Sequence, residues 1–160
     1  MAADSSANPL ASPGEEPDAS GPAAPPYRVT EQVGFLLRKA HQRASAIFQD
    51  HVGDDLTPTQ FAALAALLEN GPLSQNLLGR VTAMDPATIQ GVVSRLRARD
   101  LITRQADPQD RRRFLVTLTE AGRAIARARI PSARRVTQAT LAPLTQEEET
   151  LFLSLLRRVG

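Results

Sequence analysis

The sequence predicts a mainly α-helical protein that carries one small β-hairpin. Apolar residues recur at helical spacing through most of residues 30–98 and 120–160, which is the pattern of amphipathic helices. Between these stretches the pattern changes to two short runs, 101–104 and 114–118, that have the composition of strands. Two short helices followed by a hairpin with a basic tip form a winged helix-turn-helix, and this is the fold class that we expect.

The helix-turn-helix is predicted by capping residues that precede two short helical patterns. Ser74 is placed to accept a backbone N–H of the first helix, and Asp85 is placed to cap the second. Pro86 suits the first position of the second helix because no N–H is needed there. The apolar residues expected on the core sides are Leu77, Leu78, Val81, Ile89, Val92, Val93 and Leu96.

The opposite face of these helices carries small and polar side chains. Such side chains hydrogen-bond to base edges and phosphates when a helix lies in the major groove. We therefore expect these two helices to bind double-stranded DNA. The residues assigned to the DNA interface are Ser74, Gln75, Asn76, Thr88, Gln90, Gly91, Ser94 and Arg95.

The loop between the two predicted strands carries three consecutive arginines, Arg111, Arg112 and Arg113. An isolated arginine run is usually a solvated face, but this run lies at the tip of a predicted hairpin. Such a wing either follows the phosphate backbone or places an arginine in the neighbouring minor groove. A guanidinium suits this task because its planar fork meets phosphate with two parallel hydrogen bonds.

The charge distribution agrees with DNA binding. Residues 1–26 hold four acidic and no basic residues, so the net charge of +2 for the whole chain leaves +6 on residues 27–160. Residues 80–113 hold eight Arg against four Asp. Positive charge is therefore concentrated in the segment where the motif needs it.

Residues 57–122 resemble the DNA-binding domain of the MarR family of bacterial transcription regulators. The wing carries the family pattern D-x-R-x5-L-T, followed by glycine, as Asp110, Arg112, Leu118, Thr119 and Gly122. The recognition helix matches the family at Asp85, Thr88 and Leu96. The resemblance implies a regulator that works as a symmetric dimer.

Three stretches resemble the subgroup of this family that represses catabolism of nicotinate and related aromatic acids. They are EQVGFLLRKAHQR, LTPTQFAAL and LGRVTAMDPATIQGVVSRL. One departure from the family is Asp100, where many members have glycine. We expect it to make the exit from the recognition helix less permissive of a left-handed residue.

The first and last helical stretches, residues 30–52 and 120–160, are more apolar than a lone helix-turn-helix needs. We expect them to pack together and against their copies in a homodimer. Two recognition helices would then meet a palindromic operator with half-sites roughly 34–36 Å apart. The residues assigned to the dimer interface are Val33, Leu37, Ala40, Ala44, Ile47, Leu151 and Leu155.

A polar stripe of Arg38, His41 and Ser45 runs beside this apolar seam. Two interpretations stay open: a plain solvent face, or the border of a cavity for an acidic ligand. In the second, Arg38 or His41 pairs with a carboxylate and Phe35 or Phe48 contacts a ring. The family resemblance implies that the ligand is a small aromatic carboxylate, such as a hydroxylated nicotinate.

Two further segments carry expectations about shape. Residues 1–26 contain six Pro and seven Ala with scattered acids, so we expect a disordered tail. Such a tail is either simply solvated or competes with DNA for the basic surface. Pro131 lies inside the predicted helix 120–141, where a proline removes one hydrogen bond and clashes with the preceding turn. A kink or break is therefore expected near Ile130.

Composition excludes several other functions. There is no cysteine, hence no disulfide, thiolate nucleophile or cysteine redox switch. His41 and His51 are ten residues apart on one helix and make no ready metal pair. We find no glycine-rich phosphate loop and no nucleophile elbow, so neither an enzyme nor a cofactor is expected. No apolar run spans a membrane and no signal peptide is recognised, which predicts a cytoplasmic protein.

The predicted function is a dimeric, sequence-specific repressor that a small aromatic acid releases from its operator. The alternative is a ligand-independent DNA-binding or architectural protein. Release of the operator by aromatic acids distinguishes the two.

Overall fold

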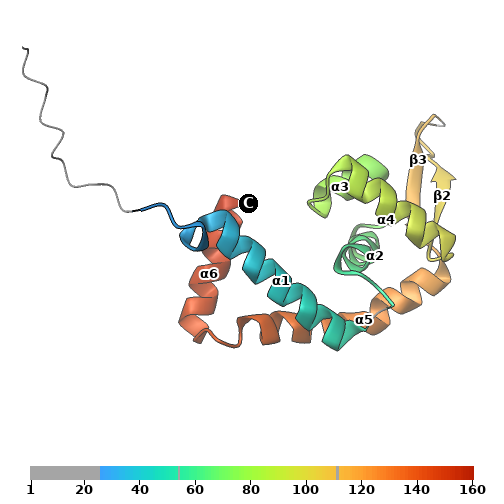
Figure 1. The fold of residues 1–160 in the computed structure, drawn as a ribbon. Coiled ribbons are helices and arrows are strands. Elements are labelled where there is room, and N and C mark those ends of the chain that lie inside the picture. Colours follow the sequence, from blue (N-terminus) through green and yellow to red (C-terminus); the bar gives the residue numbers. More distant parts are fainter. Residues whose placement is uncertain (1–25, 54, 111) are drawn as a thin grey trace, which may run out of the picture.

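The computed structural model describes residues 26–53, 55–110 and 112–160 (Figure 1). Its elements, in chain order, are η1 (Val29–Glu31), α1 (Val33–Val52), α2 (Pro58–Asn70), β1 (Leu73–Ser74), α3 (Gln75–Val81), α4 (Pro86–Ala98), β2 (Ile102–Ala106), β3 (Phe114–Leu118), α5 (Glu120–Leu141) and α6 (Gln146–Val159). The winged helix-turn-helix fold is confirmed. All but the last residue of the predicted tail, residues 1–26, lies outside the described residues.

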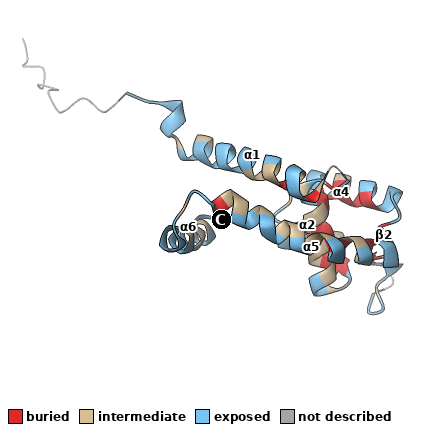
Figure 2. Ribbon diagram, turned by 90° about the horizontal axis from the view of Figure 1, so that it is seen from below, coloured by how far each residue is buried: buried red, intermediate tan, exposed pale blue. Residues whose placement is uncertain are grey.

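One end of the molecule is a compact lobe made of α2, α3, α4 and the strands (Figure 1). The long helices α1 and α5 pack along each other and extend away from this lobe towards α6. Buried residues concentrate in the lobe, whereas the first half of α1 and all of α6 are exposed or half-buried (Figure 2). The hydrophobic core thus belongs to the winged helix-turn-helix.

The core is built from one apolar stripe of each helix in the lobe. The largest fully buried side chains are Leu56, Leu64, Leu78, Leu96, Val52, Val92 and Val116. On α4 the four residues expected to face inward are all buried. On α3 the expectation was wrong for Val81, the last residue of the helix, which is 48 % exposed.

The sheet is antiparallel with strand order β1-β3-β2. Ile102 pairs with Leu118 and Ala106 pairs with Phe114, which confirms the predicted hairpin. The strand β1 was not predicted, since Leu73 and Ser74 are too few to show an alternating pattern. This short strand forms because Leu73 pairs with Val116, which adds β1 to the sheet beside β3.

The predicted helix caps are present. The hydroxyl of Ser74 accepts the N–H of Leu77 at 3.3 Å, and the carboxylate of Asp85 accepts the N–H groups of Ala87 and Thr88 at 3.0 and 2.9 Å. These side chains satisfy donors that have no partner inside the helix. Both helices of the helix-turn-helix are therefore capped at their N-termini.

The recognition helix α4 ends differently from the sequence expectation. Asp100 has φ of 53°, in the left-handed region, although it lacks the freedom of glycine. Backbone hydrogen bonds from Asp100 to Arg97 and from Leu101 to Leu96, both 3.0 Å, impose this conformation. Aspartate tolerates it better than most residues because its short polar side chain can hydrogen-bond locally.

The helix α5 is continuous from Glu120 to Leu141 with Pro131 inside it, so the expected break is absent. Figure 1 shows that its two halves run in different directions, which agrees with a kink. A proline costs one backbone hydrogen bond and a steric clash with the preceding turn, and bending relieves the clash without ending the helix.

Of the two helices in residues 120–160, only α5 packs on α1 within one subunit, and the expectation that the last helix, α6, does so is wrong. Among the described elements, α1 packs mainly on α5, and α6 makes at most marginal contact with any other element. The reason is geometric, because α5 carries the chain along α1 and α6 then leaves this pair at an angle (Figure 2).

Candidate DNA interface and effector hollow

The face of α4 opposite its core side is open to solvent, as DNA reading requires. Gln90, Ser94 and Arg95 are exposed, and Gly91 is half-buried beneath the guanidinium of Arg95. On α3, Asn76 is exposed while Ser74 and Gln75 are half-buried. The structure thus brings the predicted residues of both helices to one surface of the lobe.

Thr88 and Asp85 hold each other at the start of α4. The hydroxyl of Thr88 donates to the carboxylate of Asp85 at 2.5 Å, in addition to the backbone bonds. The hydroxyl and N–H of Thr88 hold the pKa of Asp85 below its ordinary value, since they stabilise the charged form. The proton of Thr88 is therefore engaged within the protein, and Thr88 stabilises the helix start.

The wing loop is closed by its aspartates. The N–H of Asp107 donates to the carbonyl of Arg113, and the N–H of Arg113 donates to that of Asp110, both at 2.9 Å. The carboxylate of Asp110 accepts the N–H of Arg112 at 3.0 Å. Within the described residues, the guanidinium groups of Arg112 and Arg113 form no ion pair and are exposed. Arg111 lies outside the described residues.

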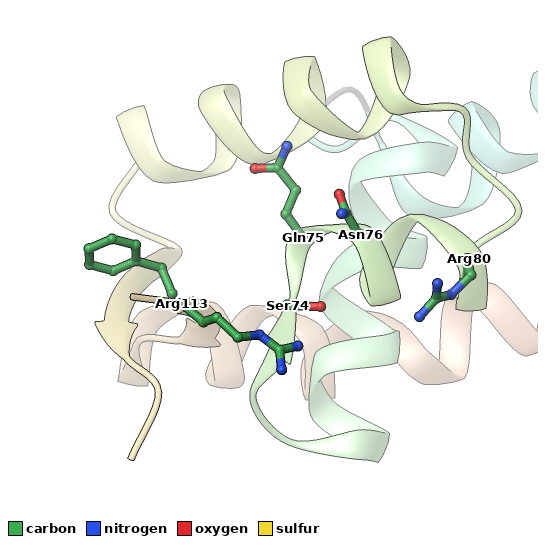
Figure 3. A pocket seen from close by; sticks show the side chains of 6 residues that line it. Ser74, Gln75, Asn76, Arg80 and Arg113 are labelled. Atoms are coloured by element: carbon green, nitrogen blue, oxygen red, sulfur yellow. The ribbon is translucent and has the colours of Figure 1, made fainter. Parts of the chain in front are cut away.

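Arg113 extends from the wing towards the start of α3 (Figure 3). There it borders a hollow of about 400 Å³ lined by Ser74, Gln75, Asn76, Arg80, Arg113 and Phe114. The sequence prediction missed Arg80 and Phe114 here. The excess of arginine in residues 80–113 was a usable signal for Arg80, whereas the position of Phe114 depends on how the hairpin folds.

A second hollow of about 200 Å³ lies between α3, α4 and β2. Its lining is Gln75, Gln90, Val93, Ser94, Arg97 and Arg104. The guanidinium of Arg104 donates to the amide oxygen of Gln75 at 2.8 Å. Arg97 and Arg104 were also missed, although both belong to the same arginine-rich segment.

A third hollow of about 200 Å³ lies where α1, α2 and α5 meet. It is lined by His41, Ala44, Ser45, Phe48, Pro58 and Val136. Three of the predicted ligand residues, His41, Ser45 and Phe48, come together here. Pro58 and Val136 carried no sequence signal because they belong to other helices, α2 and α5, and reach the hollow only through packing.

The other two predicted ligand residues lie nearer the start of α1. The guanidinium of Arg38 lies over the ring of Phe35, 5.7 Å from its centroid, outside the lining of the hollow. Phe48 is only 6 % exposed and packs against Phe61, with ring centroids 5.9 Å apart. The hollow therefore has one rigid aromatic wall and a polar rim.

The apolar residues predicted at a dimer interface divide into two groups. Val33, Leu37, Leu151 and Leu155 are exposed, by 46 to 73 % of their surface. Ala44 and Ile47 are half-buried against their own subunit, and Ala40 is exposed. The described part of α1 and α6 thus carries an uncovered apolar surface.

The described residues form neither a metal-binding cluster nor a membrane-spanning helix. In residues 26–53, 55–110 and 112–160, no group of three or more His, Cys, Asp or Glu is arranged to hold a metal ion. No helix among these residues is long and apolar enough to cross a membrane.

Comparison with known proteins agrees with the fold and with a DNA-binding function. Residues 54–113 match the model of the MarR family. The HTH-type transcriptional repressor NicR of Pseudomonas putida is 50 % identical over 135 residues, which are 84 % of this chain and 85 % of that protein.

Two solved structures are similar over nearly their whole lengths. A probable transcriptional regulator from Pseudomonas aeruginosa has a TM-score of 0.77 and 51 % identity, covering 83 % of this chain and 100 % of that one. Bordetella bronchiseptica BpsR, whose DNA binding is regulated by 6-hydroxynicotinic acid, has a TM-score of 0.80 and 44 % identity, covering 84 % and 97 %. The chain therefore belongs to the MarR family and is a DNA-binding transcription regulator, not an enzyme.

Proposed function

We propose that this protein is a homodimeric cytoplasmic repressor that a small aromatic carboxylate, of the hydroxynicotinate kind, releases from a palindromic operator. The observation that carries the proposal is the position of the hollow between α1, α2 and α5. The helices α1 and α5 extend from the lobe, whereas α2 belongs to the lobe. A ligand in this hollow touches both parts of the molecule.

The lining of the hollow suits a single aromatic ring that carries a carboxylate. Phe48, Pro58 and Val136 supply apolar contact, while His41 and Ser45 supply hydrogen-bond donors. Its volume of about 200 Å³ is below the range usual for drug-sized ligands, which favours a small acid.

Arg38 and Phe35 remain part of the proposed site. Arg38 is exposed and Phe35 is half-buried, and a cation–π contact at the surface contributes only about 0.5–1 kcal/mol. A carboxylate that forms a charge-assisted hydrogen bond with the guanidinium of Arg38 can replace this contact.

The relatives support the class of ligand. BpsR responds to 6-hydroxynicotinic acid and shares 44 % of its residues with this chain. NicR, a repressor, shares 50 %. We take 6-hydroxynicotinate as the first compound to test.

The proposed mechanism depends on the distance between two recognition helices. Two copies of α4 fit consecutive major grooves only at one separation, which the dimer helices set. A ligand that binds better to another separation lowers operator occupancy. A swing from 99 % to 1 % occupancy of the binding-competent state requires about 5.5 kcal/mol of differential affinity.

The dimer is proposed to cover the exposed apolar residues of α1 and α6, with residues 30–52 and 120–160 as the dimerisation segments. Residues 57–119 then present Ser74, Gln75, Asn76, the polar face of α4 and the wing arginines to DNA. The exposed side chains Val33, Leu37, Leu151 and Leu155 are the strongest candidates for burial between subunits.

One experiment tests the proposal: titration of the DNA upstream of the protein's own gene, with and without aromatic acids. We expect specific binding without ligand, and release by 6-hydroxynicotinate but not by its amide, which lacks the carboxylate charge. Tight binding that no aromatic acid weakens would favour the ligand-independent alternative.

A further inference from the structure

One long-range hydrogen bond joins the wing to the helix-turn-helix. Arg104 on β2 donates from Nη2 to Oε1 of Gln75, the first residue of α3, at 2.8 Å, across 29 residues of sequence. The two side chains border the same hollow as Gln90 and Ser94 of α4. The bond therefore lies on the surface assigned to DNA.

The chemistry of the pair determines how the Gln75 amide is oriented. A guanidinium has only N–H donors, so it must meet the oxygen of an amide and never its nitrogen. With Oε1 held by Arg104, the NH2 group of Gln75 points away from the arginine. Within the described residues this NH2 group donates no hydrogen bond, which leaves both N–H groups available.

We propose that Arg104 is a positioning residue that makes Gln75 a hydrogen-bond donor towards DNA. The inference rests on the proposed DNA interface and adds the chemistry that Gln75 recognises. A glutamine that is free to flip suits adenine, since its oxygen accepts from N6 and its nitrogen donates to N7. A glutamine held by Arg104 pairs with acceptors: O6 or N7 of guanine, O4 of thymine, or a phosphate oxygen.

The proposal differs from a direct contact between Arg104 and phosphate in two measurable ways. A direct phosphate contact releases a counterion, so its loss flattens the slope of log K against log salt by about one unit. An arginine that acts through Gln75 leaves this slope unchanged. Its effect also disappears when Gln75 is absent.

The test is a double-mutant cycle in the full-length protein. Operator affinity is measured for wild type, Arg104→Met, Gln75→Ala and the double variant, across a salt series and with all four bases at each operator position. We expect Arg104→Met and Gln75→Ala to weaken binding by similar factors, with no further loss in the double variant. Arg104→Lys should retain wild-type affinity, because an ammonium is also only a donor.

The base series distinguishes the two sources of the acceptor. If Gln75 meets a base, Arg104→Met should raise the relative affinity for adenine at one position by about fivefold or more, since the amide can then flip. If it meets phosphate, the loss is equal for all bases while the cycle remains non-additive. Additive losses, together with a salt slope that falls for Arg104→Met, would overturn the inference.

Two controls separate this result from other failures. Arg104 is exposed and Gln75 is half-buried at the surface, so the thermal midpoints of all four proteins should agree. If Arg104→Met melts early, Arg104→Gln takes its place. If wild type binds no DNA with sequence preference, the proposed function fails, and this is visible before any variant is compared.

Discussion

A Cβ on Gly122 would lie 1.9 Å from the carbonyl oxygen of Leu101. The same oxygen accepts the N–H of Thr119 at 3.1 Å, and the hydroxyl of Thr119 donates to the carbonyl of Asp100 at 2.7 Å. The first turn of α5 is thus seated directly on the exit from the recognition helix. The Leu-Thr and glycine of the wing pattern maintain this junction, which connects α4 to the helix that extends from the lobe.

Gly122→Ala should destabilise the protein by about 3 kcal/mol or more, because backbone must move to admit the methyl group. Gly91→Ala is the matched control on α4, where the new Cβ finds only the Arg95 side chain, at 3.6 Å. It should be neutral or gain up to about 1 kcal/mol in helix propensity. Urea unfolding at one fixed protein concentration measures the free energy of unfolding of both variants. Equal stability of the two variants would contradict the tight junction.

Asp100→Gly should stabilise the protein by about 1 kcal/mol, since a left-handed conformation costs roughly that much for a residue with a Cβ. Ala83, with φ of 52°, offers a second test, and Ala83→Gly should gain at least as much. Ala98→Gly, at the last residue of α4, should instead lose up to about 1 kcal/mol. Thermal unfolding of the three variants gives the comparison, and a loss for Asp100→Gly would show that its side chain has another role.

Arg112→Ala should weaken operator binding and flatten the dependence of log K on log salt by about one unit, if one phosphate contact is lost. The residue is exposed, and only its backbone is bound to Asp110, so the loop should keep its shape. Lys39→Ala removes the same charge from the exposed part of α1 and serves as the control. An unchanged slope for Arg112→Ala would exclude the wing from the interface.

Leu155→Asp should convert the dimer to a monomer and abolish operator binding together with it. An unpaired charge in an apolar interface costs several kcal/mol. Leu155 is 46 % exposed in one subunit, so this variant perturbs the fold less than a change at the half-buried Ile47. Thr150→Asp, on another face of α6, is the control. If light scattering gave the mass of a monomer for the wild-type protein, this prediction would lose its basis.

His41→Ala and Arg38→Ala should keep the operator affinity of the wild type but require more ligand for release. Both side chains are exposed on α1 and lie outside the proposed DNA interface, so the operator affinity of the unliganded state should be unaffected. A loss of one charge-assisted hydrogen bond corresponds to about 1.5–3 kcal/mol. Release curves with 6-hydroxynicotinate measure the shift. Curves identical to wild type would place the ligand elsewhere.

Local chemistry explains which elements could be predicted. Ser74 and Asp85 cap α3 and α4 by bonds to residues two or three positions away, and the core stripe of α4 depends only on helical spacing. The hairpin joins β2 and β3, two strands that are neighbours in the sequence. Such features follow from short stretches of sequence because their causes act within a few residues.

The assembly of the hollows could not be predicted in this way. His41, Ser45 and Phe48 share a face of α1, but Pro58 and Val136 join them only because α2 and α5 pack there. Similarly, the bond between Arg104 and Gln75 depends on how the wing meets α3. The periodicity of one segment carries no information about a partner residue on another helix or strand.

The amino-acid pattern alone determined the order of the elements, their caps, the basic wing and the apolar seam of α1. Tertiary packing decided that Asp100 adopts a left-handed conformation and that α5 continues through Pro131. It also decided that α6 packs on no other described element of its subunit, which leaves the apolar face of α6 exposed. At Asp100, whose carbonyl accepts the hydroxyl of Thr119, and at Pro131, the energy of long-range contacts, of order several kcal/mol when summed, exceeds a local preference of about 1–3 kcal/mol. The last helix differs, because α6 makes at most marginal contact within its own subunit. Local preference therefore places the helices along the chain, and packing decides which of their faces meet.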